Sequence, residues 1–319
     1  MNKAFLLGII SSFFFAFTFI LNQQMNISSS SWLWSSSLRY IFMLPILFVM
    51  LIIKNKLLEV LIEIKKKPLK WFIWSIIGFG LFYAPLSFAS SYGPSWLIAG
   101  TWQITIVAGA LLSPLFFQTI ETKNGTYKVR NKIPQKSLLM SSVILLGIFL
   151  MQLDKAKSFS FLDVILGFIP VIIAAFSYPL GNRKMMEVCG NKLNTIQRVF
   201  GMTLCSMPFW IIISLLGYIY SGPPSKGQLS QSLIVAIFSG VIATILFFKA
   251  TDLVKNNSTN LAIIESTQSG EVIFTLLLGI LIFHDTVPNI VALIGLILVI
   301  IGMVLNSLLN SCLLYTSPS

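Results

Sequence analysis

Apolar residues run along this chain in long blocks that are separated by short polar segments. Ten blocks can be marked off, at residues 4–22, 32–53, 71–90, 95–117, 137–153, 161–180, 195–220, 229–250, 258–282 and 288–309. Most of them approach the ~20 residues that an α-helix needs to cross the hydrocarbon core of a bilayer. The segments between the blocks are too short to form a soluble domain. The pattern predicts an all-α integral membrane protein with ten transmembrane helices.

Composition agrees with a membrane class and explains the charge of the chain. Of 319 residues, 56% are hydrophobic and 10% are charged, against about 25% charged in a soluble domain. The net charge is +12, but most of the 22 basic residues fall in alternate polar segments, notably 54–70, 123–136 and 183–198. Such a bias sets orientation, with the positive side cytoplasmic. We therefore expect both termini in the cytoplasm and no binding of nucleic acid.

The two halves of the chain resemble each other weakly. Sliding the chain along itself lays residues 81–103 over residues 246–268, and this register pairs Gln103 with Gln268. Each half then holds five apolar blocks, and an odd number makes the second half enter the membrane from the opposite side. The predicted architecture is ten helices as two inverted five-helix repeats, 1–153 and 154–311, which is a common plan of secondary transporters.

The last eight residues, "CLLYTSPS" at 312–319, resemble a translated sequencing adapter rather than protein sequence. We interpret this segment as a probable adapter tail and exclude it. The alternative is a genuine short polar tail.

The ninth block carries charge where hydrocarbon is expected. In "LAIIESTQSGEVIF" (261–274), Glu265, Gln268 and Glu271 lie on one face of a helix, within an arc of about 120°. A charged side chain at the bilayer centre costs at least a few kcal/mol on insertion scales, so such residues face the bundle interior or a water-filled cavity. We expect this face to line a central cavity.

Arg39 in the second block lies at nearly the depth of Glu271. Because arginine stays charged, a Glu271–Arg39 pair is expected, which leaves Glu265 unpaired and free to exchange protons. Two other interpretations remain open: Glu265 lies close enough to the cytoplasm to be solvated, or the Arg39–Glu271 pair is purely structural.

Four further side chains are candidates for the cavity wall by their depth: Gln103, Trp102, Tyr40 and Tyr178. The two glutamines could instead only form hydrogen bonds between helices. The sequence contains no metal-ligand cluster and no group of catalytic residues, so it predicts neither a cofactor nor an enzyme. His284–Asp285 is interpreted as the end of a helix.

Several stretches together resemble the drug/metabolite transporter superfamily (EamA-like), and more narrowly its multidrug resistance efflux transporter family. They are "WLWSSSLRYIFMLP", "GFGLFYAPLSFASSYGPSWLIAGTWQITI", "AAFSYPLGNRKMMEVC", "QRVFGMTL" and "ESTQSGEVIFTLLLG". The resemblance implies two inverted five-helix repeats in a bacterial cell membrane and export of small organic molecules driven by an ion gradient. Small four-helix relatives use a glutamate in their first helix, whereas the first block here has no acidic residue.

Together these observations predict a secondary transporter that exports small organic solutes or drugs and is coupled to protons. The alternative within transport is a carrier of amino acids, nucleotide-type compounds or other metabolites. A non-transporting membrane sensor and a lipid-modifying enzyme are less favoured. The expected partners are the solute and the lipid bilayer, and the sequence leaves open whether two copies form a homodimer.

Overall fold

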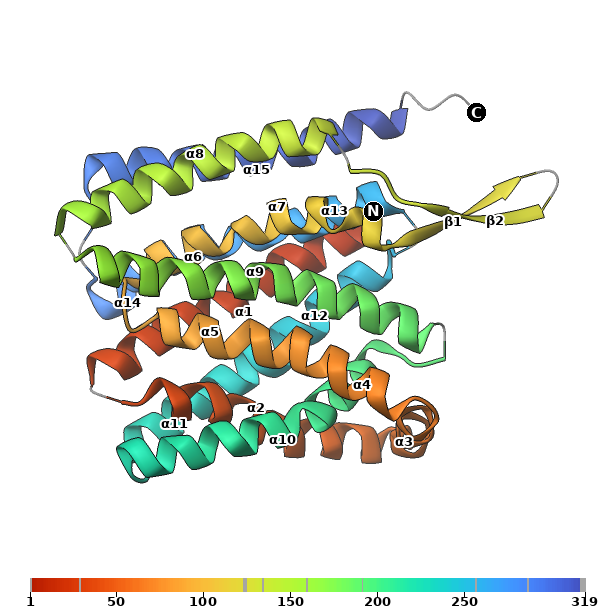
Figure 1. Cartoon of the computed structure of the whole chain (residues 1–319), viewed down its shortest axis with the longest axis horizontal. Coiled ribbons are helices and arrows are strands. Elements are labelled where there is room, and N and C mark those ends of the chain that lie inside the picture. Colours follow the sequence, from red (N-terminus) through yellow and green to blue (C-terminus); the bar gives the residue numbers. More distant parts are fainter. Residues whose placement is uncertain are drawn as a thin grey trace.

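The computed structural model describes residues 2–28, 30–122, 125–133, 135–158, 160–190, 192–255, 257–285 and 287–315. These residues form a bundle of roughly antiparallel helices from which one β-hairpin projects (Figure 1). Helix α3, the hairpin, the start of α1 and the end of α15 all lie at one end of the bundle. We call this the hairpin end.

The first half of the chain contains α1 (Asn2–Ile27), α2 (Trp32–Ile53), α3 (Leu57–Lys66), α4 (Pro68–Ser75), the π-helical segment η1 (Ile76–Gly80), α5 (Leu81–Ala89), α6 (Ser95–Trp102), α7 (Ile104–Leu111), the 3₁₀ turn η2 (Ser113–Leu115), strands β1 (Phe117–Thr122) and β2 (Gly125–Arg130), and α8 (Gln135–Ser158). The second half contains α9 (Phe161–Cys189), α10 (Thr195–Ser221), α11 (Lys226–Val235), the π-helical segment η3 (Ala236–Ala243), α12 (Thr244–Asp252), α13 (Ser258–Ser266), the 3₁₀ turn η4 (Thr267–Ser269), α14 (Gly270–Phe283) and α15 (Ile290–Tyr315).

Within the described residues, seven helices are long and apolar enough to cross a membrane. Three further apolar helices are shorter, at Ser95–Leu111, Ser141–Leu153 and Ile290–Leu305. These helices confirm the predicted all-helical membrane class. The predicted tail at 312–319 is described only as far as Tyr315, where α15 ends.

The helices pack around α1, which contacts η3, α12 and α14. Helices α8 and α15 lie side by side at one edge of the bundle, and α2 packs on α10 at the opposite edge (Figure 1). Between them, α5 packs along α9. Residues from α1, α5, α6, α9 and α14 therefore meet in the interior.

Helix α9 is longer than its apolar block predicts. The sequence pattern ends near Pro179, but the helix continues to Cys189 and brings Asn182 and Arg183 into the buried interior. Proline removes one backbone hydrogen bond, and neighbouring helices in a membrane bundle can compensate for that loss. The polar segment that follows the apolar block at 161–180 is therefore helical as far as Cys189.

A close approach of two backbones fixes this part of α9. A Cβ atom on Gly181 would lie 2.2 Å from the Cα of Gly78 in η1. Only glycine permits the contact, which sets the position of Tyr178, three residues before it, and of Arg183, two residues after it.

Helix α3 and the hairpin were not predicted by the apolar blocks. Helix α3 is amphipathic, with Val60 buried and Leu58 exposed. It is bound to α10 because Gln197 Nε2 donates to the backbone oxygen of Lys56 (2.9 Å) and to the Glu59 carboxylate (2.8 Å). Hydrogen bonds from Lys56 and Gln197 hold the pKa of Glu59 below its usual value.

We expect Gly181→Ala to destabilise the protein, because the new methyl group meets the η1 backbone, which cannot move away as a flexible side chain can. Overpacking of this kind costs about 1–3 kcal/mol. The measurement is the thermal unfolding midpoint in detergent. Gly227→Ala in α11 is the control, since the nearest atom to its new Cβ lies 3.9 Å away. Equal midpoints for both variants would contradict the proposed backbone contact.

Candidate functional site

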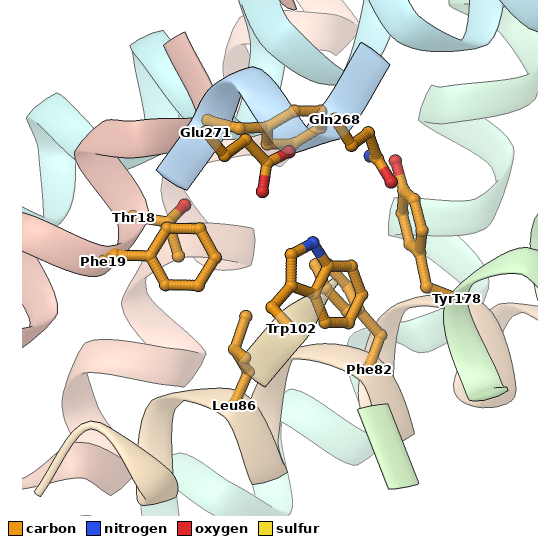
Figure 2. Close-up of a pocket in the computed structure, with 9 residues that line it drawn as sticks. Thr18, Phe19, Phe82, Leu86, Trp102, Tyr178, Gln268 and Glu271 are labelled. Atoms are coloured by element: carbon orange, nitrogen blue, oxygen red, sulfur yellow. The ribbon is translucent and has the colours of Figure 1, made fainter. Parts of the chain in front are cut away.

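A small cavity of about 10 Å³ lies in the interior of the bundle, which is about the space that one water molecule needs. It is lined by residues of six helical segments: Phe15, Thr18 and Phe19 of α1, Phe82 and Leu86 of α5, Trp102 of α6, Tyr178 of α9, Gln268 of η4 and Glu271 of α14 (Figure 2). Aromatic rings make up most of the wall. Glu271 is the one acidic residue in it.

An interruption of the ninth apolar helix gives Gln268 and Glu271 their positions. Helix α13 ends at Ser266, and one 3₁₀ turn separates it from α14. The hydroxyls of Ser266 and Thr267 donate to backbone oxygens one turn back, at 2.7 Å each. These bonds add side-chain donors to carbonyl groups in the last turn of α13, where the regular helical hydrogen-bond pattern is interrupted.

Helix α1 packs closely against this interruption through two small residues. A Cβ on Gly8 would lie 2.2 Å from the Thr267 hydroxyl, and a Cβ on Gly270 would lie 2.5 Å from the Ser12 hydroxyl. The close approach brings Thr18 and Phe19, farther along α1, to the same cavity that Glu271 faces (Figure 2).

Glu271 is 1% exposed, and its carboxylate points into the cavity toward the indole N–H of Trp102 (Figure 2). Its Oε1 has no hydrogen-bond partner among the described residues. Tyr178 lies beside the amide of Gln268 (Figure 2), with its ring 4.5 Å from that of Phe82. The predicted cavity residues Glu271, Gln268, Trp102 and Tyr178 are thus together.

Arg39 does not form the expected ion pair with Glu271. The two side chains interact electrostatically, but no nitrogen of Arg39 lies within 4.0 Å of a Glu271 oxygen. Instead the guanidinium lies over the ring of Tyr83, 4.1 Å from its centroid, and Nη1 donates to the Thr18 hydroxyl at 3.3 Å. The aromatic ring and Thr18 hold the charge, so the direct pair is wrong and Arg39 reaches the cavity wall through Thr18.

Two other predicted wall residues point elsewhere. Gln103 is wholly buried, at the junction of α6 and α7, but its Nε2 donates to the backbone oxygen of Ala99 at 3.0 Å. Tyr40 stacks on Trp210 with centroids 4.4 Å apart. Neither residue lines the cavity, because the rotation of each side chain about its helix differs from the expected one.

Glu265 is not unpaired, as the sequence suggested, and it is not solvated. Arg183 of α9 binds its carboxylate with two hydrogen bonds, Nε to Oε1 at 2.9 Å and Nη2 to Oε2 at 2.5 Å. Both side chains are less than a tenth exposed. A third donor, Arg183 Nη1, binds the backbone oxygen of Gly109 at 2.9 Å. Sequence reasoning missed Arg183 because the residue lies beyond the apolar part of α9.

Gly109 is part of this arrangement. A Cβ at this position would lie 2.8 Å from Glu265 Oε2 and 3.2 Å from Arg183 Nη2. The ion pair therefore joins α7, α9 and α13 between the cavity and the hairpin end. A bidentate Arg–carboxylate pair of this kind is strong and directional.

At the opposite end, polar contacts join α1, α6 and the end of α14. The Ser95 N–H donates to Gln23 Oε1 at 2.6 Å, and its hydroxyl donates to Asp285 Oδ2 at 3.4 Å. Burial raises the pKa of Asp285, and the Ser95 hydrogen bond partly opposes this. His284 ends α14 in a left-handed conformation (φ 55°), which confirms the predicted helix end.

Among the described residues, no three His, Cys, Asp or Glu side chains are placed to hold a metal ion.

Comparison with known proteins identifies the family. The chain matches EmrE, described as "Putative multidrug resistance efflux transporter", over residues 2–312. The chain belongs to this family. The resemblance seen in the sequence is therefore confirmed.

Two relatives and one solved structure extend this finding. The chain is 52% identical to the uncharacterized protein YjlA of Bacillus subtilis (strain 168), over 96% of this chain and 94% of that protein. It is 48% identical to an uncharacterized 42.1 kDa protein of Shouchella clausii, over 84% of this chain and 70% of that protein. One crystal structure has a TM-score of 0.67 over 98% of this chain and 99% of that chain, at 11% identity, which shows a shared fold.

We expect Glu265→Gln and Arg183→Gln each to destabilise the protein by about 3–5 kcal/mol, because each change leaves its partner charged and buried. The double variant should lose less than the sum of the two. Denaturant unfolding of the four proteins in micelles measures the coupling. Glu187→Gln, which breaks the partly exposed Lys184–Glu187 pair, is the control and should change stability by less than about 1 kcal/mol. Strictly additive losses would argue against the pair.

Proposed function

We propose that this protein is a proton-coupled secondary transporter that exports small organic solutes, with Glu271 as the residue that exchanges protons. The observation that carries the proposal is the Glu271 carboxylate, buried in the interior of a membrane protein, directed into a small interior cavity and incompletely hydrogen-bonded. Ionisable residues in such positions are typical of proton and substrate pathways. Membership of an efflux transporter family supports the same function.

The sequence predicted that Glu265 exchanges protons, whereas we assign this role to Glu271 because the two carboxylates have different hydrogen-bond partners. Arg183 stabilises the ionised form of Glu265 through two charge-assisted hydrogen bonds. A carboxylate held in this way is suited to a fixed contact between helices. Glu271, with Oε1 unpartnered, can accept a proton without breaking an ion pair.

We also propose ten membrane crossings arranged as two inverted five-helix repeats. Packing in the two halves supports this: α5 packs on α9 as α12 packs on α1, and α10 packs on η1 as α2 packs on η3. The register that pairs Gln103 with Gln268 also superposes the junction of α6 and α7 on η4. The three shorter apolar helices would then complete the ten crossings.

The hairpin end is proposed to face the cytoplasm of a bacterial cell. Helix α3 and its flanks contribute Lys54, Lys56, Lys65, Lys66 and Lys67 to this end, and strand β2 contributes Lys128 and Arg130. Basic residues favour the cytoplasmic side. With this orientation, the Arg183–Glu265 contact closes the cavity toward the cytoplasm and the Ser95–Asp285 contact closes it toward the outside.

Transport would require these two closures to open in turn. In the described conformation both are formed, and the cavity, at about 10 Å³, is far smaller than the ~300–1,000 Å³ typical of ligand sites. The conformation therefore corresponds to a closed intermediate between the two open forms. Rocking of one repeat against the other is the general way in which such transporters alternate access.

We expect Glu271→Gln to abolish export driven by a pH gradient, because the amide cannot take up or release a proton. The measurement is uptake of a panel of organic cations and amino acids into everted vesicles, with and without the gradient. Glu187→Gln at the surface is the control. Normal gradient-driven transport by Glu271→Gln would overturn the assignment of the proton site, and absence of any flux in the wild type would overturn the transport function.

A further inference from the structure

Helix α3 runs across the direction of the other helices instead of along it. Figure 1 shows α3 nearly end-on at the hairpin end, where it follows α2 and precedes α4. Because the membrane-spanning helices run along the bundle, a helix that crosses them lies roughly parallel to the membrane plane. Helix α3 is therefore oriented as a helix that lies on a membrane rather than one that spans it.

Contacts with α10 place α3 at the level of the lipid headgroups. Helix α10 has 27 residues and is thus about 40 Å long, close to the ~40–45 Å thickness of a bilayer with its headgroup regions. Gln197, at the start of α10, binds the backbone oxygen of Lys56 at 2.9 Å. A Cβ on Gly201, near the start of the same helix, would lie 3.1 Å from the side chain of Val60. Helix α3 thus packs on the first two turns of α10, in the headgroup region of that leaflet.

The two faces of α3 differ in what surrounds them. Val60 is fully buried against the bundle, whereas Leu58 and Ile62 are exposed. At about 100° per residue, Leu58, Ile62 and Lys65 fall within an arc of about 60°, roughly opposite Val60. The outward face therefore combines apolar side chains with a lysine, which is the pattern of a helix that lies in a membrane interface.

The exposed apolar side chains continue along the chain into a surface that meets lipid tails. Leu69 follows α3 directly, and Phe72 and Ile73 lie one turn farther along α4; all three are exposed. Helix α4 begins an apolar segment, Pro68–Ala89, that is long enough to cross a membrane. Its exposed side chains therefore contact acyl chains, and the outward face of α3 borders the same lipid.

The lysines around α3 are more numerous than its acidic residues can neutralise. Two of them pair with the glutamates of α3 at i,i+3 spacing. Lys54, Lys65 and Lys70 are exposed and form no ion pair with another described residue. Exposed lysines at the membrane surface attract anionic headgroups. The orientation of the protein accounts for basic residues at this end, but not for an outward apolar face among them.

We propose that α3 is an interfacial helix that binds an anionic phospholipid, with the lipid phosphate among the exposed lysines and the acyl chains against Leu58 and Ile62. Lysine can reach the phosphate while its apolar stem lies along the acyl chains. A phospholipid satisfies both parts of the surface, whereas a nucleic acid or an acidic peptide would leave Leu58 and Ile62 in water. The inference rests on the membrane class of the protein and not on transport.

Lipid binding to the full-length protein in detergent, followed by native mass spectrometry, tests the charged part of the site. The probes are phosphatidylglycerol, phosphatidylcholine and glycerol phosphate, which carries the phosphate without acyl chains. We expect phosphatidylglycerol to bind at least about tenfold more tightly than phosphatidylcholine, and Lys65→Gln/Lys70→Gln to remove most of that preference. Lys128→Gln/Lys132→Gln, which removes the same charge from β2 and the segment after it, is the matched control and should keep the preference.

Protection from a reagent in water tests the apolar part. Leu58→Cys on α3 and Val129→Cys on the hairpin replace side chains that are 70% and 41% exposed. In phosphatidylglycerol nanodiscs, a charged maleimide should label Leu58→Cys at least about tenfold more slowly than Val129→Cys, after subtraction of the wild-type rate. Because Leu58 is the more exposed of the two in the protein itself, contact with lipid is required to produce this order.

Three binding results would overturn the lipid site: equal affinity for the two phospholipids, an unchanged preference in Lys65→Gln/Lys70→Gln, or binding of glycerol phosphate as tight as that of phosphatidylglycerol. Labelling of Leu58→Cys as fast as that of Val129→Cys would also overturn it, and would show that α3 faces water and is open to a soluble partner. Export into everted vesicles is measured separately, so failure of the lipid site leaves the proposed transport function intact.

Discussion

Inside a bilayer, every charge and every free backbone group has to be compensated by the protein itself, because no solvent is available to do so. The segment from α13 to α14 carries two carboxylates and a helix interruption within a few residues. The protein compensates the interruption with serine and threonine hydroxyls, and Glu265 with Arg183. Of the two carboxylates, Glu271 is the one that keeps an oxygen without a hydrogen-bond partner among the described residues.

The fold class could be read from the sequence because its cause is local. Length and hydropathy of a block decide whether it can span a bilayer, and they do not depend on what the block contacts. The bounds of α9 could not be read in this way, since its continuation past Pro179 depends on the approach of η1 to Gly181. That contact joins residues far apart in the sequence.

The sequence indicated which polar side chains of the candidate site are buried, but not how they pair. Polar residues in apolar blocks marked Glu265, Gln268 and Glu271, and all three are buried. Which cation each carboxylate meets depends on helix rotation and on neighbouring chains. Arg183 was discounted as a topological charge, and Arg39 was paired by depth alone without regard to the ring of Tyr83.

The two carboxylates differ in a way that their sequence context does not reveal. An arginine with three hydrogen bonds, two of them to Glu265, fixes that residue at a junction of three helices. Such a contact is either formed or broken, so it is suited to hold the cavity closed in one conformation and to release it in another. Glu271 faces a cavity and has no ion pair with a described residue, so in the proposed function its proton exchanges while the helices stay packed. If one residue had both tasks, each proton transfer would also loosen the closure. Placing the two carboxylates about two turns apart on an interrupted helix separates the tasks and still lets movement of that helix affect both.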